Sequence, residues 1–157
     1  DQPALGAVYK MVEIKNEPRI KISEQTTKIS IPGAKNIFRL IGKEGRYLLD
    51  LMQLRTEAPP QAGHSLWAHH PFDAFRKVEV TPTAVKPLLE TLFENGVWKL
   101  PIDLKAAQER STENLKNLRE DILRRENPTP YKVSISDNLK KTFENCLQQE
   151  APRRHLA

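Results

Sequence analysis

The sequence predicts an α+β protein, with a mainly antiparallel β unit in the first half followed by helices. Up to about residue 80, short segments alternate polar and apolar side chains and are separated by turn residues, which is typical of hairpin-connected strands. Beyond that point, apolar residues recur at spacings of three and four, which indicates amphipathic helices. The 12 prolines among 157 residues divide the chain into many short elements.

The strands of the first half are expected to pair as hairpins. The turn signal KNEP separates the first two, the stop signal Pro32-Gly33 ends the third, and the loop GKEG has the length of a hairpin connection. We therefore expect strands at residues 8–14, 19–23, 27–31, 36–41, 47–52, 65–68 and 75–80.

The second half is expected to be mainly helical. A helix beginning at Thr81 or Thr83 would place five apolar residues on one face and end at Asn95-Gly96. A charged, solvent-facing helix is expected over residues 104–126, with a break near Ser111. Residues 131–135 alternate as one last strand. A final helix should then be capped by Ser136 and bury one face, formed by Leu139, Phe143, Cys146 and Leu147.

These patterns divide the chain into four parts. Residues 1–54 form a β-rich segment, residues 55–64 a proline-containing linker, residues 65–150 an α/β subdomain and residues 151–157 a basic tail. The chain begins at Asp1 and enters an apolar run within a few residues. A natural N-terminus usually has some loosely ordered residues before its first element. We therefore expect this chain to be a piece of a longer protein, and the missing part would contain the residues that carry out its chemistry.

Composition excludes several classes of protein. There are 25 basic and 20 acidic residues, so the net charge is +5, and no apolar run reaches the roughly 18 residues of a membrane helix. The single cysteine, Cys146, excludes an internal disulfide and a CxxC metal site. No secretory signal is visible. We expect a cytoplasmic protein that does not bind a membrane.

Conventional catalytic and metal-binding patterns are weak in this sequence. His64, His69 and His70 are clustered, but their spacing does not match a helix or hairpin ligand pair, so we interpret them as solvated loop residues. Cys146 lies on the expected buried face of the last helix and is interpreted as a core residue rather than a nucleophile. We predict no catalytic residue and no metal ligand within the chain.

One stretch, KISEQTTKISIPGAK at residues 21–35, has the pattern of a phosphate-binding surface. If it is extended, Lys21 shares a face with Ser23, and Lys28 shares one with Ser30. Neighbouring ammonium and hydroxyl donors suit phosphate oxygens. The alternative is the polar outer face of a sheet, with lysines protecting an exposed edge.

Several runs of residues resemble the nicotinate phosphoribosyltransferase family, and in particular its animal members. The resemblance covers almost the whole chain in order, is most specific at the front, and is weakest between residues 90 and 127. The runs that carry it are LGAVYKMV at 5–12, PRIKISE at 18–24, PGAKNIFR at 32–39, DLMQL at 50–54, PPQAG at 59–63 and PYKVSIS at 130–136.

The resemblance implies the C-terminal part of a type II phosphoribosyltransferase, whose irregular α/β barrel would lie upstream. Family members join nicotinate to phosphoribosyl pyrophosphate, with ATP as co-substrate, giving nicotinate mononucleotide and pyrophosphate on the route to NAD. They are homodimers with active sites at the subunit interface, and Mg²⁺ accompanies the pyrophosphate. The phosphorylated histidine, the nicotinate-binding arginine and the phosphate loop would all precede Asp1, so this fragment alone should be inactive.

The resemblance also implies a role for two lysines. Lys21 and Lys28 match, in order, lysines that touch phosphates in the related nicotinamide-using enzyme, and they are the only site residues carried over. Two other functions compete with this one: a free-standing basic module that binds nucleic acid, and a non-catalytic interaction domain. Aromatic residues make up only 6% of the chain and do not interleave with the lysines as a base-stacking surface requires, so we expect no nucleic acid partner.

Overall fold

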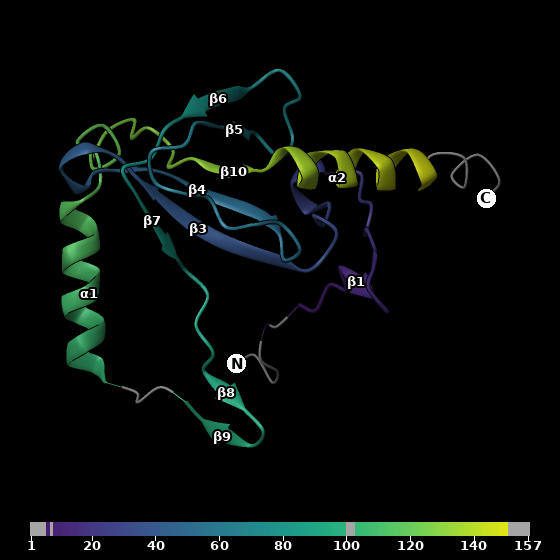
Figure 1. The fold of residues 1–157 in the computed structure, drawn as a ribbon, viewed down its shortest axis with the longest axis horizontal. Helices are drawn as coiled ribbons and strands as arrows, with labels where there is room; N and C mark the ends of the chain where they lie inside the picture. Colours follow the sequence, from purple (N-terminus) through teal and green to yellow (C-terminus); the bar gives the residue numbers. More distant parts are fainter. Residues whose placement is uncertain (1–5, 7, 100–102, 151–157) are drawn as a thin grey trace.

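The computed structural model describes residues 6, 8–99 and 103–150 (Figure 1). Short strands dominate, and two helices lie in the second half of the chain. The strands are β1 (Glu13–Ile14), β2 (Glu17–Pro18), β3 (Lys35–Ile41), β4 (Tyr47–Leu54), β5 (Leu66–His69), β6 (Lys77–Val80), β7 (Ala84–Pro87), β8 (Phe93–Glu94), β9 (Val97–Trp98) and β10 (Val133–Ile135). The helices are α1 (Leu104–Lys116) and α2 (Asp137–Glu150).

A six-stranded sheet forms the centre of the molecule, in the order β6-β5-β10-β4-β3-β7. Every neighbouring pair is antiparallel except β10 and β4, which run parallel with Ser134 opposite Leu51. The predicted α+β class is therefore confirmed. β10, the last strand in the sequence, lies between β4 and β5 rather than at an edge.

The core occupies one face of this sheet because β3 and β4 alternate in register. Leu40 pairs with Leu49 and Phe38 pairs with Leu51, so the buried side chains of both strands point to the same side. The opposite face carries the pairs Ile37–Met52 and Arg39–Asp50. One face is thus apolar and closed, whereas the other holds a charged pair at its centre.

Helix α2 confirms the predicted cap and half of the predicted buried face, because Cys146 and Leu147 are only half-buried. The hydroxyl of Ser136 accepts a hydrogen bond from the backbone N–H of Leu139, which is the capping interaction that the sequence predicts. Leu139 and Phe143 are buried, and the helix packs on β4 and β5. The same Ser136 hydroxyl donates to Glu57, which ties the connection between β4 and β5 to the start of α2.

The strands expected at the front of the chain are shorter or absent. The first hairpin exists, as β1 and β2 around Lys15 and Asn16, whose φ angles of 51° and 63° give the left-handed backbone of a two-residue turn. The prediction of strands at 19–23 and 27–31 is wrong, because a 3₁₀ turn occupies Thr26–Lys28 and no long strand lies beside these residues. Alternation alone does not form a strand without a partner.

The helix predicted between residues 81 and 96 is also wrong. Residues 84–87 form β7, which pairs with the edge of β3, and β8 and β9 form a small hairpin around Asn95-Gly96. Both turn residues have positive φ, 51° and 79°, as a two-residue hairpin turn requires. The pairing of β7 with β3 satisfies the backbone groups along the edge of β3, which a helix at this position would leave unpaired.

The charged helix is confirmed in kind but not in length. Asp103 caps α1 by accepting from the N–H groups of Lys105 and Ala106. The helix runs unbroken past Ser111 and ends at Lys116, so both the expected break and the expected end at residue 126 are wrong. No α1 side chain is buried, as its thin apolar stripe predicts. Within the described residues, no helix is long and apolar enough to cross a membrane.

The outer segments leave much apolar surface in water. The chain exposes 12189 Å², whereas a compact monomer of 18.0 kDa exposes about 8,000 Å². Helix α1 and the β8–β9 hairpin extend away from the sheet (Figure 1). Tyr9, near the front of the chain, is 87% exposed, and Trp98 in the hairpin is 64% exposed. Only the sheet and α2 form a closed unit.

Candidate functional site

The two lysines that the sequence predicts to bind phosphate lie in one segment that is closed by hydrogen bonds. The backbone N–H of Lys21 donates to the hydroxyl of Ser30 over 2.7 Å, and the N–H of Ser30 donates to the carbonyl of Lys21 over 3.1 Å. Lys28 ends the 3₁₀ turn only two residues before Ser30. Both lysines are exposed, so their ammonium groups are accessible to a ligand.

A third lysine joins this segment. The ammonium group of Lys10 donates to the backbone carbonyl of Lys28 over 3.0 Å, which places the charge of Lys10 at the end of the 3₁₀ turn. Ser30 is buried, and its hydroxyl accepts from the backbone instead of facing the solvent beside Lys28. The segment therefore gathers positive charge, but on a folded loop rather than on the strand face that the alternation predicts. Phosphate contact by Lys21 and Lys28 stays a prediction.

The segment is fixed to β3 by a second set of contacts. The carboxylate of Glu13 accepts from the N–H of Ala34 over 2.7 Å, and the N–H of Gly33 donates to the carbonyl of Val12 over 2.7 Å. The ammonium of Lys35 donates to the carbonyl of Ile31 over 2.7 Å. Burial lowers the pKa of the Lys35 ammonium, and the nearby carboxylate of Glu13 partly opposes that effect.

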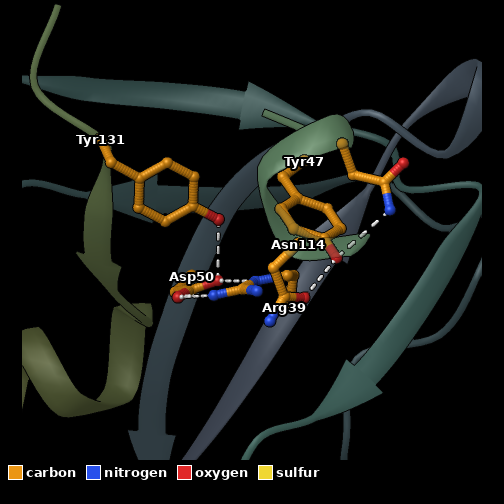
Figure 2. A network of polar contacts seen from close by, with 6 residues as sticks. Arg39, Tyr47, Asp50, Asn114 and Tyr131 are labelled. Atoms are coloured by element: carbon orange, nitrogen blue, oxygen red, sulfur yellow. Dashed lines mark hydrogen bonds and ion pairs between the residues drawn. The ribbon is translucent and has the colours of Figure 1, made fainter. Parts of the chain in front are cut away.

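A charged network lies on the open face of the central sheet (Figure 2). Arg39 of β3 makes a two-pronged ion pair with Asp50 of β4: Nε lies 2.8 Å from Oδ1, and Nη2 lies 2.9 Å from Oδ2. The hydroxyl of Tyr131 donates to the same Oδ1 over 2.8 Å. Burial, followed by the interactions with Asp50, raises the pKa of Tyr131, so the phenol keeps its proton.

Tyr47 connects this network to α1. The guanidinium carbon of Arg39 lies 4.4 Å from the centre of the Tyr47 ring, a cation–π arrangement. The Tyr47 hydroxyl donates to Oδ1 of Asn114 over 2.8 Å. The hydrogen bonds with Asp50 dominate in raising the pKa of Arg39, which stays charged.

A cavity of about 480 Å³ opens between this network and α1. The sheet and the segment before β10 supply four polar side chains, and α1 with the residues just after it supplies the opposite wall. Its lining residues are Arg39, Tyr47, Asp50, Ala107, Arg110, Ser111, Asn114, Leu115, Leu118 and Tyr131. Sequence reasoning missed this site, although a single charge inside each of two consecutive apolar strands, NIFRLI and YLLDLM, was a usable signal.

Comparison with known proteins gives concordant results in sequence and in structure. Residues 34–143 match the model of the nicotinate phosphoribosyltransferase C-terminal domain. Nicotinate phosphoribosyltransferase 2 of Arabidopsis thaliana is 44% identical over 155 residues, which is 96% of this chain and 28% of the plant protein. The human nicotinate phosphoribosyltransferase is 34% identical over 152 residues, 96% of this chain and 28% of that protein.

The crystal structure of human nicotinic acid phosphoribosyltransferase superposes with a TM-score of 0.75 and 30% identity, over 92% of this chain and 27% of that one. The chain belongs to the nicotinate phosphoribosyltransferase family. It spans about 28% of the length of the curated relatives that it matches. The resemblance seen in the sequence is confirmed.

The family match places the two candidate regions differently. Arg39, Asp50 and Tyr131 fall inside the stretch that matches the C-terminal domain model, whereas Lys21 and Lys28 precede it. The human and plant nicotinate phosphoribosyltransferases nevertheless align over 96% of the chain. The lysine segment is therefore part of the similarity, although it lies outside the domain model.

The prediction that the three clustered histidines are solvated loop residues is wrong for His69. His69 is 6% exposed, and its Nε2 lies 2.6 Å from Oδ1 of Asp137 at the start of α2. His64 is exposed and His70 is half-buried. Among the described residues, no group of three or more His, Cys, Asp or Glu side chains could hold a metal ion. Cys146 is half-buried, and burial raises the pKa of its thiol, which disfavours a thiolate nucleophile.

Proposed function

We propose that this chain is the C-terminal part of an enzyme that joins nicotinate to phosphoribosyl pyrophosphate, with ATP hydrolysis, and so makes nicotinate mononucleotide for NAD synthesis. The observation that carries the proposal is agreement over nearly the whole chain with nicotinate phosphoribosyltransferases, in sequence at 44% identity and in fold at a TM-score of 0.75. A shared fold alone would not indicate a shared reaction. Here the sequence and the fold point to the same family.

Within that enzyme, the proposed role of this part is to present cations to phosphate. When the bond between ribose and pyrophosphate breaks, negative charge develops on the leaving group, and donors already held in place stabilise it. Lys21 and Lys28 are exposed on a segment whose backbone is fixed by Ser30 and by the contacts of Glu13 and Lys35. Such a segment loses little freedom when a phosphate binds.

Mg²⁺, if it accompanies pyrophosphate, would be held elsewhere, because the described residues offer no suitable group of ligands. We further propose that the full-length protein is a cytoplasmic homodimer and that the nicotinate and ATP sites lie in its upstream part. Size-exclusion chromatography with light scattering on the full-length protein tests the dimer, which a monomeric mass would contradict.

The proposed activity is tested by assaying the full-length protein with nicotinate, phosphoribosyl pyrophosphate, ATP and Mg²⁺. We expect nicotinate mononucleotide and pyrophosphate to form in equal amounts. The isolated 157-residue chain is the matched control and should form no product. Absence of product from correctly folded full-length protein would refute the proposed activity. Turnover by the isolated chain would refute the proposal that the nicotinate and ATP sites lie in the upstream part.

A further inference from the structure

In the cavity between the sheet and α1, the oxygens of Asp50 and the side-chain oxygen of Asn114 already accept hydrogen bonds. Both carboxylate oxygens of Asp50 receive hydrogen bonds: Oδ1 from Arg39 and Tyr131, and Oδ2 from Arg39. The carbonyl oxygen of Asn114 receives the Tyr47 hydroxyl. The only carboxylate among the lining residues, which could attract a cation, is thus already paired within the protein.

The donors of the same wall are not exhausted. The terminal nitrogen Nη1 of Arg39 takes no part in the ion pair with Asp50, which uses Nε and Nη2. The side chains of Arg110 and Ser111 make no hydrogen bond or ion pair with another residue in the described part of the chain. The amide nitrogen of Asn114 stands beside the oxygen that Tyr47 uses. A ligand in this cavity would therefore meet donors.

The lining side chains also carry a net positive charge, which favours an anion as the free donors do. Asp50 offsets the charge of Arg39, and Arg110 adds a positive charge that no lining carboxylate balances. The position of Arg39 is fixed, because its guanidinium lies 4.4 Å from the centre of the Tyr47 ring and 5.8 Å from that of Tyr131. A planar guanidinium held in this way loses little freedom on binding an oxyanion.

The remaining lining residues are apolar. Ala107, Leu115 and Leu118 lie on the α1 side of the cavity, beside the polar side chains of the same wall. Ala107, Ser111 and Asn114 recur at spacings of four and three along the chain, which puts them on one face of the helix. The cavity thus has a polar end and an apolar side, and its volume of about 480 Å³ is in the range of small-molecule sites.

We infer that this cavity binds a small organic anion, with its carboxylate or phosphate group between Arg39 and Arg110 and its apolar part against Leu115 and Leu118. A structural ion pair accounts for Arg39, Asp50 and Tyr131, but not for the donors that α1 adds opposite them. The inference does not depend on the proposed activity, because none of these residues belongs to the lysine segment.

The test places a reporter in the cavity of the full-length protein. Tyr47 is replaced by 3-fluorotyrosine, and its ¹⁹F resonance is followed while inorganic phosphate or, separately, benzoate is added at constant ionic strength. We expect a saturable shift with at least one of these probes and none with chloride. A saturable shift with phosphate alone indicates a phosphate ligand, and one with benzoate alone indicates a carboxylate.

The variant Arg110→Ala should bind the same probe about tenfold to a hundredfold more weakly, the usual loss for one charged hydrogen bond. Arg124→Ala is the matched control, because it removes the same charge from an exposed position that does not line the cavity. Its affinity should not change. Absence of a saturable shift with both probes, an equal shift with chloride, or unchanged affinity in Arg110→Ala would each overturn the inference.

Discussion

The β3–β4 hairpin and the β8–β9 hairpin show how differently one motif can use its apolar residues. In the first, Leu40 and Leu49 are 0% and 1% exposed, because further strands flank the pair and complete a core. In the second, Phe93 and Trp98 pack edge to face with ring centres 5.4 Å apart, and Phe93 is still 56% exposed. A hairpin with no third layer is marginal in water. We therefore expect that another segment covers the β8–β9 hairpin in the full-length protein.

The largest effect on stability is expected in the closed region. Leu40→Ala should lower the free energy of unfolding of the full-length protein by about 2–5 kcal/mol, because it leaves a cavity in the core. Urea unfolding followed by circular dichroism measures it. The matched variant Leu123→Ala, at an exposed position, should change that free energy by no more than about 0.5 kcal/mol. Equal effects would show that the sheet is not the stable centre.

The lysine segment lies outside the closed region, so its substitutions should affect catalysis rather than stability. Lys21→Ala and Lys28→Ala should each raise the activation barrier by about 2–4 kcal/mol, the usual cost of losing one positioned donor. That corresponds to about thirtyfold to a thousandfold in kcat/KM for phosphoribosyl pyrophosphate. Lys43→Ala, an exposed lysine in the β3–β4 loop, is the control. Wild-type efficiency in both variants would mean that these lysines only solvate the surface.

One substitution tests whether the β8–β9 hairpin is covered in the full-length protein. Phe93→Ser should destabilise the full-length protein by about 1.5–3 kcal/mol if the hairpin docks there, because an apolar ring then leaves a buried contact. The same change in the isolated chain should cost no more than about 0.5 kcal/mol. Thermal unfolding of the four proteins gives both differences. A small effect in the full-length protein would show that the hairpin stays in solvent.

The smallest effect is expected at the charged face of the sheet. The pKa of Tyr131 is raised above its ordinary value of 10.0 in the folded state, so the folded phenol keeps a proton that the unfolded one loses. The stability from this group is therefore complete below about pH 10 and falls as the pH rises further. Tyr131→Phe should flatten the loss of stability above about pH 10, measured by urea unfolding. An unchanged slope would contradict the assigned shift.

Local signals predicted the elements whose partners are close in sequence. β3 and β4 are joined by the short loop GKEG and alternate on both sides of it, so register and faces follow from the residues themselves. Ser136 and the apolar spacing of α2 likewise act within one helix. Around residues 95–96 two local signals conflict: the leucines have helical spacing, whereas the dipeptide Asn95-Gly96 strongly favours a hairpin. The structure has the hairpin, so the predicted helix is wrong.

The candidate sites were predicted unevenly for the same reason. Lys21 and Lys28 carry a local pattern and a family resemblance, so they could be named from the sequence. In the network of Arg39, Asp50 and Tyr131, the hydrogen bond from Tyr131 to Asp50 joins residues 81 positions apart along the chain. No local pattern places Tyr131 beside Asp50.

The sequence by itself determined the composition of each face, because side chains alternate along a strand whatever it pairs with. It also determined the α+β class and the family. Only the tertiary structure decided that β10 inserts between β4 and β5, which brings Tyr131 to Asp50 and α2 onto the sheet. The physical reason is that such contacts come from surface shared by distant segments, and they form only when its burial repays the entropy of closing a long loop.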